Sequence, residues 1–299
     1  MIKIVLAGGT GLIGSNLHLK LKQKNYKVIL LTTQADKADD VEIFYWNPYD
    51  THFSEHIFSD ADVFINLAGA PIFDKSFTKT RKKLLLDSRT LPNINLLSFL
   101  QNKKIKLPYF ISASATGYYP NICSYILDEN STKDLSFVSQ LVQAWEKSAM
   151  DFTANGTSVA ILRFGIVFSK KGGFVKQLAS PIRYGLGAIP GSGRQIISWV
   201  HIDDVTDAIL FILEKKLQGI YNIVGDHPET LENIGNAIAK RLHRKIFLPH
   251  IPVWVLKLIF GERADLLLTS QHVSGLKLKQ NGFDMRYKTI QSALSEIYP

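Results

Sequence analysis

The stretch Lys3-Ile-Val-Leu-Ala-Gly-Gly-Thr-Gly-Leu-Ile-Gly14 decides the fold of this 299-residue chain. Its apolar start reads as a buried strand, glycines follow at 8, 11 and 14, and Leu17 and Leu21 continue at helical spacing. In such a strand–turn–helix unit the first glycine allows the tight turn and the second leaves room for a pyrophosphate. The third lets the helix pack close to the strand.

The same stretch predicts a dinucleotide site, because phosphates would meet the free N–H groups and positive dipole end of the helix. The alternative is a tight strand–helix turn that holds no ligand. Under the first interpretation the residues expected to contact the cofactor here are Gly8, Thr10, Gly11, Leu12, Ile13 and Gly14.

Apolar strand-like runs alternate with helical patterns along the chain, which indicates right-handed βαβ units and a parallel sheet. Strands are predicted near 2–7, 27–32, 41–46, 63–68, 108–114 and 158–164, and helices near 12–24, 77–102 and 136–154. The predicted fold class is α/β, a Rossmann doubly wound parallel sheet with a smaller mixed α/β C-terminal domain. Its predicted boundaries are 1–168 for the Rossmann domain, to which 196–226 return, and 169–299 for the smaller domain.

Two helix starts are expected in the second half of the chain. One helix begins near Asp203 and buries Val205 and Ile209, with Asp203 or Asp204 as its N-cap. The other begins after Thr230, which caps a stripe of apolar residues at helical spacing.

The end of the second strand reads Leu31-Thr32-Thr33-Gln34, and no acidic residue follows until Asp36. An acidic side chain there would accept hydrogen bonds from the ribose 2′-hydroxyl of NAD(H) and repel the 2′-phosphate of NADP(H). Its absence favours NADP(H), with Thr32 and Thr33 as contacts and Lys37 near enough to help neutralise the phosphate. NAD(H) stays open as the alternative.

Composition limits the partners. The formal net charge is +9, but the Lys and Arg residues of the tail are scattered among Leu, Ile and Val, which is typical of a solvated surface rather than of a nucleic-acid footprint. Attraction of an anionic substrate is the alternative.

With one cysteine and no long apolar stretch, we expect a cytoplasmic protein that takes a small-molecule substrate and binds no nucleic acid or membrane. His52 and His56 lack a third ligand, so no metal is expected.

Further motifs follow the glycine turn in a fixed order. They are Asn66-Leu67-Ala68-Gly69-Ala70-Pro71, Ser88-Arg89-Thr90, Ser112-Ala113-Ser114-Ala115-Thr116-Gly117-Tyr118, Trp145-Glu146, Arg163-Phe164-Gly165-Ile166 and Gly261-Glu262-Arg263-Ala264. Together they resemble the extended and atypical short-chain dehydrogenase/reductases, specifically the epimerase-like branch that carries a C-terminal extension. The resemblance covers essentially the whole chain and implies that Leu67, Ala68, Gly69, Arg89 and Ile166 also border the cofactor.

Catalysis in that superfamily uses a Tyr-x-x-x-Lys pair, in which the lysine lowers the pKa of the tyrosine phenol, and a Ser or Thr that holds the substrate oxygen. Ser114 matches the serine, whereas Tyr118, Tyr119 and Tyr125 are followed four residues later by Ile122, Cys123 and Glu129. The predicted catalytic residues are therefore Ser114 and Tyr118. Two functions remain: an NADP(H)-dependent oxidoreductase or epimerase-like enzyme of unknown substrate, or a catalytically weak or inactive NADP(H)-binding sensor or interaction protein.

Overall fold

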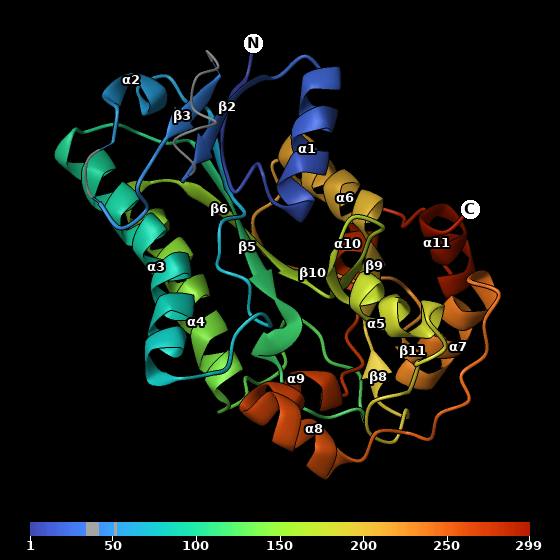
Figure 1. Cartoon of the computed structure of the whole chain (residues 1–299). Helices are drawn as coiled ribbons and strands as arrows, with labels where there is room; N and C mark the ends of the chain where they lie inside the picture. The colour runs from blue at the N-terminus through green and yellow to red at the C-terminus, as the bar shows by residue number, and fades with distance from the viewer. Residues whose placement is uncertain (34–41, 51–52) are drawn as a thin grey trace.

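The protein is described by a computed structural model that covers residues 1–33, 42–50 and 53–299, so Gln34, Asp36, Lys37 and His52 lie outside the described residues. Seven parallel strands form the central sheet in the order β3-β2-β1-β4-β5-β6-β10 (Figure 1). Their bounds are β1 Lys3–Ala7, β2 Lys27–Thr32, β3 Ile43–Tyr45, β4 Val63–Asn66, β5 Tyr109–Ala115, β6 Ser158–Phe164 and β10 Gly219–Ile223. This is the predicted Rossmann fold.

Helices cover both faces of the sheet, because strand residues point alternately to the two sides. α1 (Leu12–Gln23) and α6 (Ile202–Lys215) pack on one face, where Leu17 and Ile209 share a core with Ile4 and Leu6. α2 (Glu55–Phe58), α3 (Lys79–Asn102) and α4 (Phe137–Met150) cover the other face, where Phe99 packs with the layer that contains Phe64. The single helix expected over 136–154 is α4 followed by the 3₁₀ turn η3 (Asp151–Asn155).

Capping residues explain where several helices begin. Thr230 accepts a hydrogen bond from the Asn233 N–H and starts α7 (Leu231–Arg241), as predicted. The predicted cap of α6 was wrong: His201 is the N-cap, and its Nδ1 accepts the Asp203 N–H. Burial lowers the pKa of His201, which favours the neutral ring that can accept this bond. Asp204 lies inside the helix, where its carboxylate accepts the main-chain N–H groups of Arg286 and Tyr287.

A separate apolar cluster is built mainly from α5 (Gly173–Arg183), α7 and α11 (Ile290–Ile297), whereas Leu278 and Met285 of the C-terminal region pack into the core of the main sheet. β7 pairs with β9 and β8 with β11, outside the main sheet, whereas β10 joins the main sheet beside β6. The boundary at residue 168 stays a prediction. The bounds of these elements are α5 Gly173–Arg183, α8 Val253–Phe260, η4 Gly261–Arg263, α9 Ala264–Leu268, α10 Leu276–Gln280, α11 Ile290–Ile297, β7 Ile166–Phe168, β8 Ile196–Ile197, β9 Trp199–His201 and β11 Glu229–Thr230.

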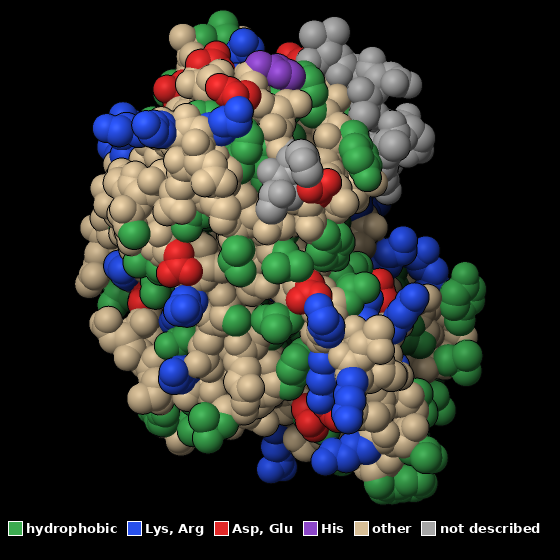
Figure 2. Space-filling model, turned by 90° about the vertical axis from the view of Figure 1, so that its left-hand side faces the viewer, with side chains coloured by type: hydrophobic (Ala, Val, Ile, Leu, Met, Phe, Trp, Pro, Cys, Tyr) green, Lys and Arg blue, Asp and Glu red, His purple; other side chains and the backbone are tan. Residues whose placement is uncertain are grey.

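The face that carries α2, α3 and α4 is seen in Figure 2, where Lys and Arg side chains form several separate groups with Asp and Glu between them. Among the described residues, no helix is both long and apolar enough to cross a membrane. Within the same part of the chain, no three His, Cys, Asp or Glu side chains are grouped so as to hold a metal ion.

Candidate cofactor and active site

The glycine turn has the backbone that its sequence predicts. Gly8 has a φ of +77°, and its carbonyl oxygen accepts the Gly11 N–H at 3.0 Å. A Cβ on Gly14 would lie 2.1 Å from that same oxygen, so only glycine lets α1 approach the turn this closely. Gly11 is different: it is the N-cap of α1 in an extended conformation, and an added Cβ would meet protein only at 3.2 Å. Gly8 and Gly14 are therefore required by the turn itself, whereas Gly11 leaves space at the start of the helix.

That space belongs to a cavity of about 390 Å³ at the carboxyl ends of β1, β2 and β4. Several predicted cofactor residues line it, but Leu12, Ile13, Gly14, Arg89 and Ile166 are not among its lining residues. Sequence reasoning missed Trp46, Pro48 and Tyr49, which follow β3 and face the cavity without belonging to any motif. The lining residues are Gly8, Thr10, Gly11, Leu31, Thr32, Thr33, Trp46, Pro48, Tyr49, Leu67, Ala68, Gly69, Ala70 and Ser88.

The loop that follows β4 forms one wall of this cavity and is held by side chains behind it. Asn66 Oδ1 accepts the Ala68 N–H at 2.9 Å, and Ser88 Oγ accepts the Ala70 N–H at 3.1 Å. Arg89 donates to the Ala70 carbonyl at 3.0 Å and places its guanidinium 5.2 Å from the Trp145 ring. Burial, with the nearby Arg81 charge, lowers the pKa of Arg89 to about 10. Arg89 therefore braces the wall from behind, and its direct contact with a cofactor stays a prediction.

The end of β5 carries a second polar arrangement, which is buried. Ser114 Oγ donates to Glu146 Oε1 at 2.6 Å, and Glu146 receives Nε and Nη2 of Arg163 at 2.7 Å each. The three residues are only 2%, 7% and 1% exposed. Burial lowers the pKa of Arg163, but the hydrogen bonds and charge of Glu146 outweigh burial and raise it. A two-pronged ion pair of this kind holds both side chains in one orientation.

Two tyrosines extend this cluster. Tyr119 Oη accepts Arg163 Nη1 at 2.9 Å and donates to Asn222 Oδ1 at 2.7 Å. Burial raises the pKa of Tyr119 to about 12 although Arg163 opposes the rise, so its phenol stays protonated at neutral pH. The Tyr118 ring lies over the Arg163 guanidinium, 3.6 Å from ring centroid to Cζ. Below, "the arginine cluster" means Ser114, Glu146, Arg163, Tyr119 and Asn222.

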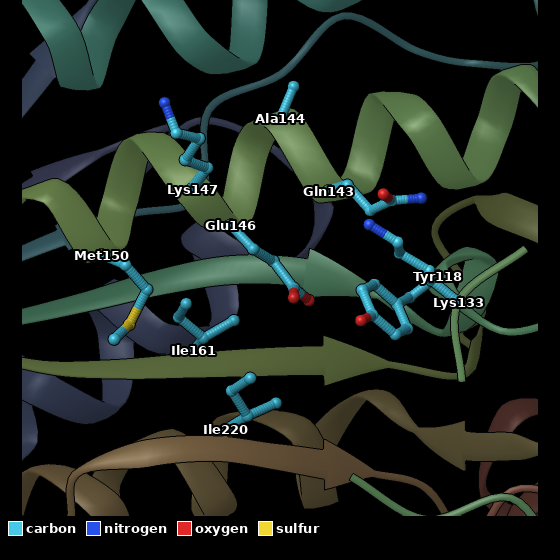
Figure 3. A pocket seen from close by; sticks show the side chains of 9 residues that line it. All are labelled: Tyr118, Lys133, Gln143, Ala144, Glu146, Lys147, Met150, Ile161 and Ile220. Atoms are coloured by element: carbon cyan, nitrogen blue, oxygen red, sulfur yellow. The ribbon is translucent and has the colours of Figure 1, made fainter. Parts of the chain in front are cut away.

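The arginine cluster borders a groove of about 390 Å³ beside α4, distinct from the cavity at the glycine turn. Figure 3 shows Glu146 from α4 and Tyr118 from the turn after β5 pointing into the same space, with Ile161 and Ile220 forming its other side. The structure thus brings the two predicted catalytic residues together through the Glu146–Arg163 pair. It does not place Ser114 or Tyr118 among the lining residues of the glycine-turn cavity.

Two valines of α4 face the turn that follows β5. A Cβ on Gly117 would lie 2.8 Å from Val138 Cγ1 and 3.8 Å from Val142 Cγ2, so these two residues, one helical turn apart, face the turn after β5. Valine has no group that can exchange a proton, so neither side chain is a candidate proton donor.

Two family models match the chain. Residues 4–224 match the NAD dependent epimerase/dehydratase family, and residues 251–297 match a domain of unknown function, DUF1731. An epimerase family protein of Staphylococcus epidermidis is 32% identical over 302 residues, which cover 99% of each chain. These relatives extend the likeness through the C-terminal helices.

Solved structures of epimerase family proteins have the same fold over nearly the whole chain. The human epimerase family protein SDR39U1, determined with NADPH, superimposes with a TM-score of 0.88 at 27% identity and covers 99% of both chains. UDP-glucose 4-epimerase of Thermus thermophilus, determined with NAD, gives a TM-score of 0.76 at 18% identity and 99% coverage of both chains, which shows the shared fold.

Proposed function

Because this chain belongs to the NAD dependent epimerase/dehydratase family, we propose that it is an NADP(H)-dependent oxidoreductase or epimerase-like enzyme that acts on a small molecule. The observation that carries this proposal is the cavity at the glycine turn. Its floor is the N-terminus of α1, where Gly11 leaves room for a diphosphate, and its length runs from the ends of β2 and β3 to the loop after β4. NADPH bound to the human relative supports the choice of cofactor.

The residues present fit such a cofactor. The turn residues Gly8, Thr10 and Gly11 would hold the pyrophosphate, and Trp46, Pro48 and Tyr49 would border the adenine. Leu67, Ala68, Gly69 and Ala70 would line the ribose toward the nicotinamide half. The bound group would supply hydride transfer, and the protein would supply binding and orientation.

The preference for NADP(H) over NAD(H) depends on the end of β2. Thr32 is buried and Thr33 is exposed at the cavity, and neither brings a negative charge. Replacing Thr33 with Asp adds repulsion against a 2′-phosphate and an acceptor for a 2′-hydroxyl, so the affinity ratio of NADPH to NADH should fall by about tenfold or more. Titration calorimetry of both nucleotides against wild type and Thr33→Asp measures this ratio, with Thr33→Ser as the control. Wild type that binds NADH as tightly as NADPH would show the assignment to be wrong.

The proposed chemistry centres on Ser114. A serine hydroxyl has one proton to donate and two lone pairs, and the proton of Ser114 goes to Glu146. Glu146, paired with Arg163, acts only as an acceptor, so it keeps that proton directed toward itself. Ser114 can therefore offer only lone pairs to a substrate. We infer that Ser114 would accept a hydrogen bond from the hydroxyl form of the substrate and would not donate one to its carbonyl form.

A screen of alcohols and carbonyl compounds with NADP⁺ and NADPH tests this chemistry. For any substrate found, Ser114→Ala should lower turnover by about tenfold or more, since it removes the group that orients the reacting oxygen. The affinity for NADPH should not change, because Ser114 does not line the nucleotide cavity. Unchanged turnover in Ser114→Ala would remove this residue from the reaction.

A second candidate function is an NADP(H)-binding protein with little or no chemistry, a sensor or interaction partner. The sequence favours it, because no lysine stands four residues after Tyr118, Tyr119 or Tyr125. The hydrogen bond that commits the Ser114 proton to Glu146 favours it as well. Tight NADPH binding together with no nucleotide oxidation or reduction across the screen would establish this alternative.

A further inference from the structure

The C-terminal region meets the loop that follows β4, here called the β4 loop (residues 67–78). Arg263 of η4 donates to the Phe73 carbonyl at 2.6 Å and to Ser76 Oγ at 3.4 Å. Its guanidinium also lies 5.6 Å from the Phe73 ring and 5.8 Å from the Phe260 ring, and those two rings are 5.5 Å apart. A planar cation beside two neighbouring aromatic rings combines several hydrogen bonds with cation–π attraction, and a lysine ammonium reproduces that combination only in part.

The β4 loop reaches two sites at once. At its start Leu67, Ala68, Gly69 and Ala70 line the nucleotide cavity, and a few residues later Phe73 and Ser76 contact Arg263. From Pro71 to Thr78 it forms no helix or strand, and several of its residues are exposed. An exposed segment of this kind is ordinarily mobile.

Three arginines limit that mobility, each by donating to a different carbonyl of the loop. Arg89 binds Ala70, Arg81 binds Pro71 and Arg263 binds Phe73. The first two come from α3, which is part of the nucleotide-binding half, whereas Arg263 comes from the region matched to the domain of unknown function. The Lys82–Glu262 ion pair, 2.5 Å from Nζ to Oε2, links α3 directly to η4.

Residues 251–270 are also fixed to the other loops around the carboxyl edge of the sheet. The Gly191 N–H donates to the Ile251 carbonyl at 3.0 Å, and the Ser270 N–H donates to Asn121 Oδ1 at 2.7 Å. Figure 1 shows α8 and α9 beyond the carboxyl end of β5. This segment thus gives Arg263 a rigid base from which to hold the β4 loop.

We propose that Arg263 is a positioning residue for the nucleotide site: through it, the C-terminal region holds the β4 loop against the nicotinamide half of the bound cofactor. The proposal builds on the proposed function, since it assumes that the cavity takes NADP(H). It assigns a task to the C-terminal helices, which contribute no lining residue to the cavity.

Calorimetry with NADPH and with its fragment 2′,5′-ADP tests the proposal. Arg263→Ala should weaken NADPH binding by about five- to tenfold, the effect of losing one charged hydrogen bond that orders the wall. Binding of 2′,5′-ADP, which lacks the nicotinamide half, should change less than twofold. Arg263→Lys should recover only part of the NADPH affinity. The matched control is Arg244→Ala, because Arg244 also donates to a main-chain carbonyl of the C-terminal half, that of Arg183, and does not touch the β4 loop.

Hydrogen exchange supplies a second readout. With NADPH bound, the backbone amides of the β4 loop should exchange faster in Arg263→Ala than in wild type. If Arg263→Ala does not fold, Phe73→Leu, which removes the ring but keeps an apolar contact, should show the same selective loss. Equal losses for NADPH and 2′,5′-ADP, equal losses in Arg263→Ala and Arg244→Ala, or NADPH affinity within twofold of wild type would overturn the proposal. Wild type that binds neither nucleotide would instead refute the proposed function.

Discussion

The glycine turn and the arginine cluster lie at the same edge of the sheet but are built in opposite ways. The turn uses backbone and missing side chains from residues close together in the sequence, and it borders an open cavity. The cluster uses charged and polar side chains from β5 and the turn after it, α4, β6 and β10, and it is almost completely buried. The comparison indicates that the turn can lose ligand binding without losing the fold, whereas the cluster cannot be changed without a loss of stability.

The same contrast separates two kinds of preorganisation. At the turn, conformation is set locally, since Gly8 adopts a left-handed backbone and Gly14 lets α1 touch it. In the cluster, each side chain is oriented by hydrogen bonds to its neighbours. These bonds run from Ser114 through Glu146 and Arg163 to Tyr119 and Asn222. In the low-dielectric protein interior, a complete network of this kind specifies one conformation of the core. A network that lacks one member costs folding free energy, because a buried polar group is left unpaired.

The largest effect is expected from Glu146→Ala. It leaves the Arg163 charge buried without its partner, which typically costs about 3–5 kcal/mol of folding free energy. Urea unfolding followed by circular dichroism measures the loss. Glu214→Ala, which breaks the half-exposed ion pair with Lys24, is the control and should cost far less. Equal losses in the two variants would contradict the claim that the cluster is held by a buried charge pair.

Gly11→Val should have the next largest effect, and on binding rather than on stability. The extended backbone at Gly11 does not require glycine, although the Gly8 carbonyl oxygen, 3.2 Å from an added Cβ, would have to shift slightly. The added side chain would enter the space assigned to the pyrophosphate. We expect NADPH affinity to fall by about 100-fold or more, a few kcal/mol of binding energy, while the unfolding midpoint stays close to that of wild type.

Gly14→Val is the comparison for this variant, because its side chain would collide with the Gly8 backbone and should prevent α1 from docking. Calorimetry of NADPH binding and thermal unfolding of both variants distinguish a glycine needed for the ligand from a glycine needed for the fold. NADPH affinity unchanged in Gly11→Val would mean that the cofactor does not cross the turn at this residue.

Sequence reasoning predicted the sheet and the turn because their signals are local. The observed strands lie within one or two residues of their predicted bounds, and Thr230 caps α7 as expected. The N-cap of α6 was wrong because a neutral histidine competes with the aspartates that follow it, and only the burial of His201 reveals this. Trp46, Pro48 and Tyr49 could not be found, since they reach the cavity through the placement of β3 and belong to no recognisable motif.

The arginine cluster could be predicted only in part, because its contacts join residues that are distant in the sequence. Glu146 and Arg163 were both noted as motif residues, but no pattern in the sequence links positions 17 residues apart on a helix and a strand. Their contact follows from the parallel pairing of β5 with β6, which places Ser114 opposite Arg163, and from the packing of α4 over that pair.

Tyr119→Phe is expected to have the smallest effect and tests whether the cluster acts as one network. Removing the hydroxyl leaves Arg163 without one acceptor and Asn222 without its donor, while the ring and its packing remain. A loss of about 1–2 kcal/mol of folding free energy is expected, as for a buried hydrogen bond whose partners stay behind. In the Glu146→Ala background the same substitution should cost clearly less, because Arg163 is already displaced. Strictly additive losses would show that Tyr119 and Glu146 stabilise the fold independently, and the cluster would then be two neighbouring contacts rather than a single unit.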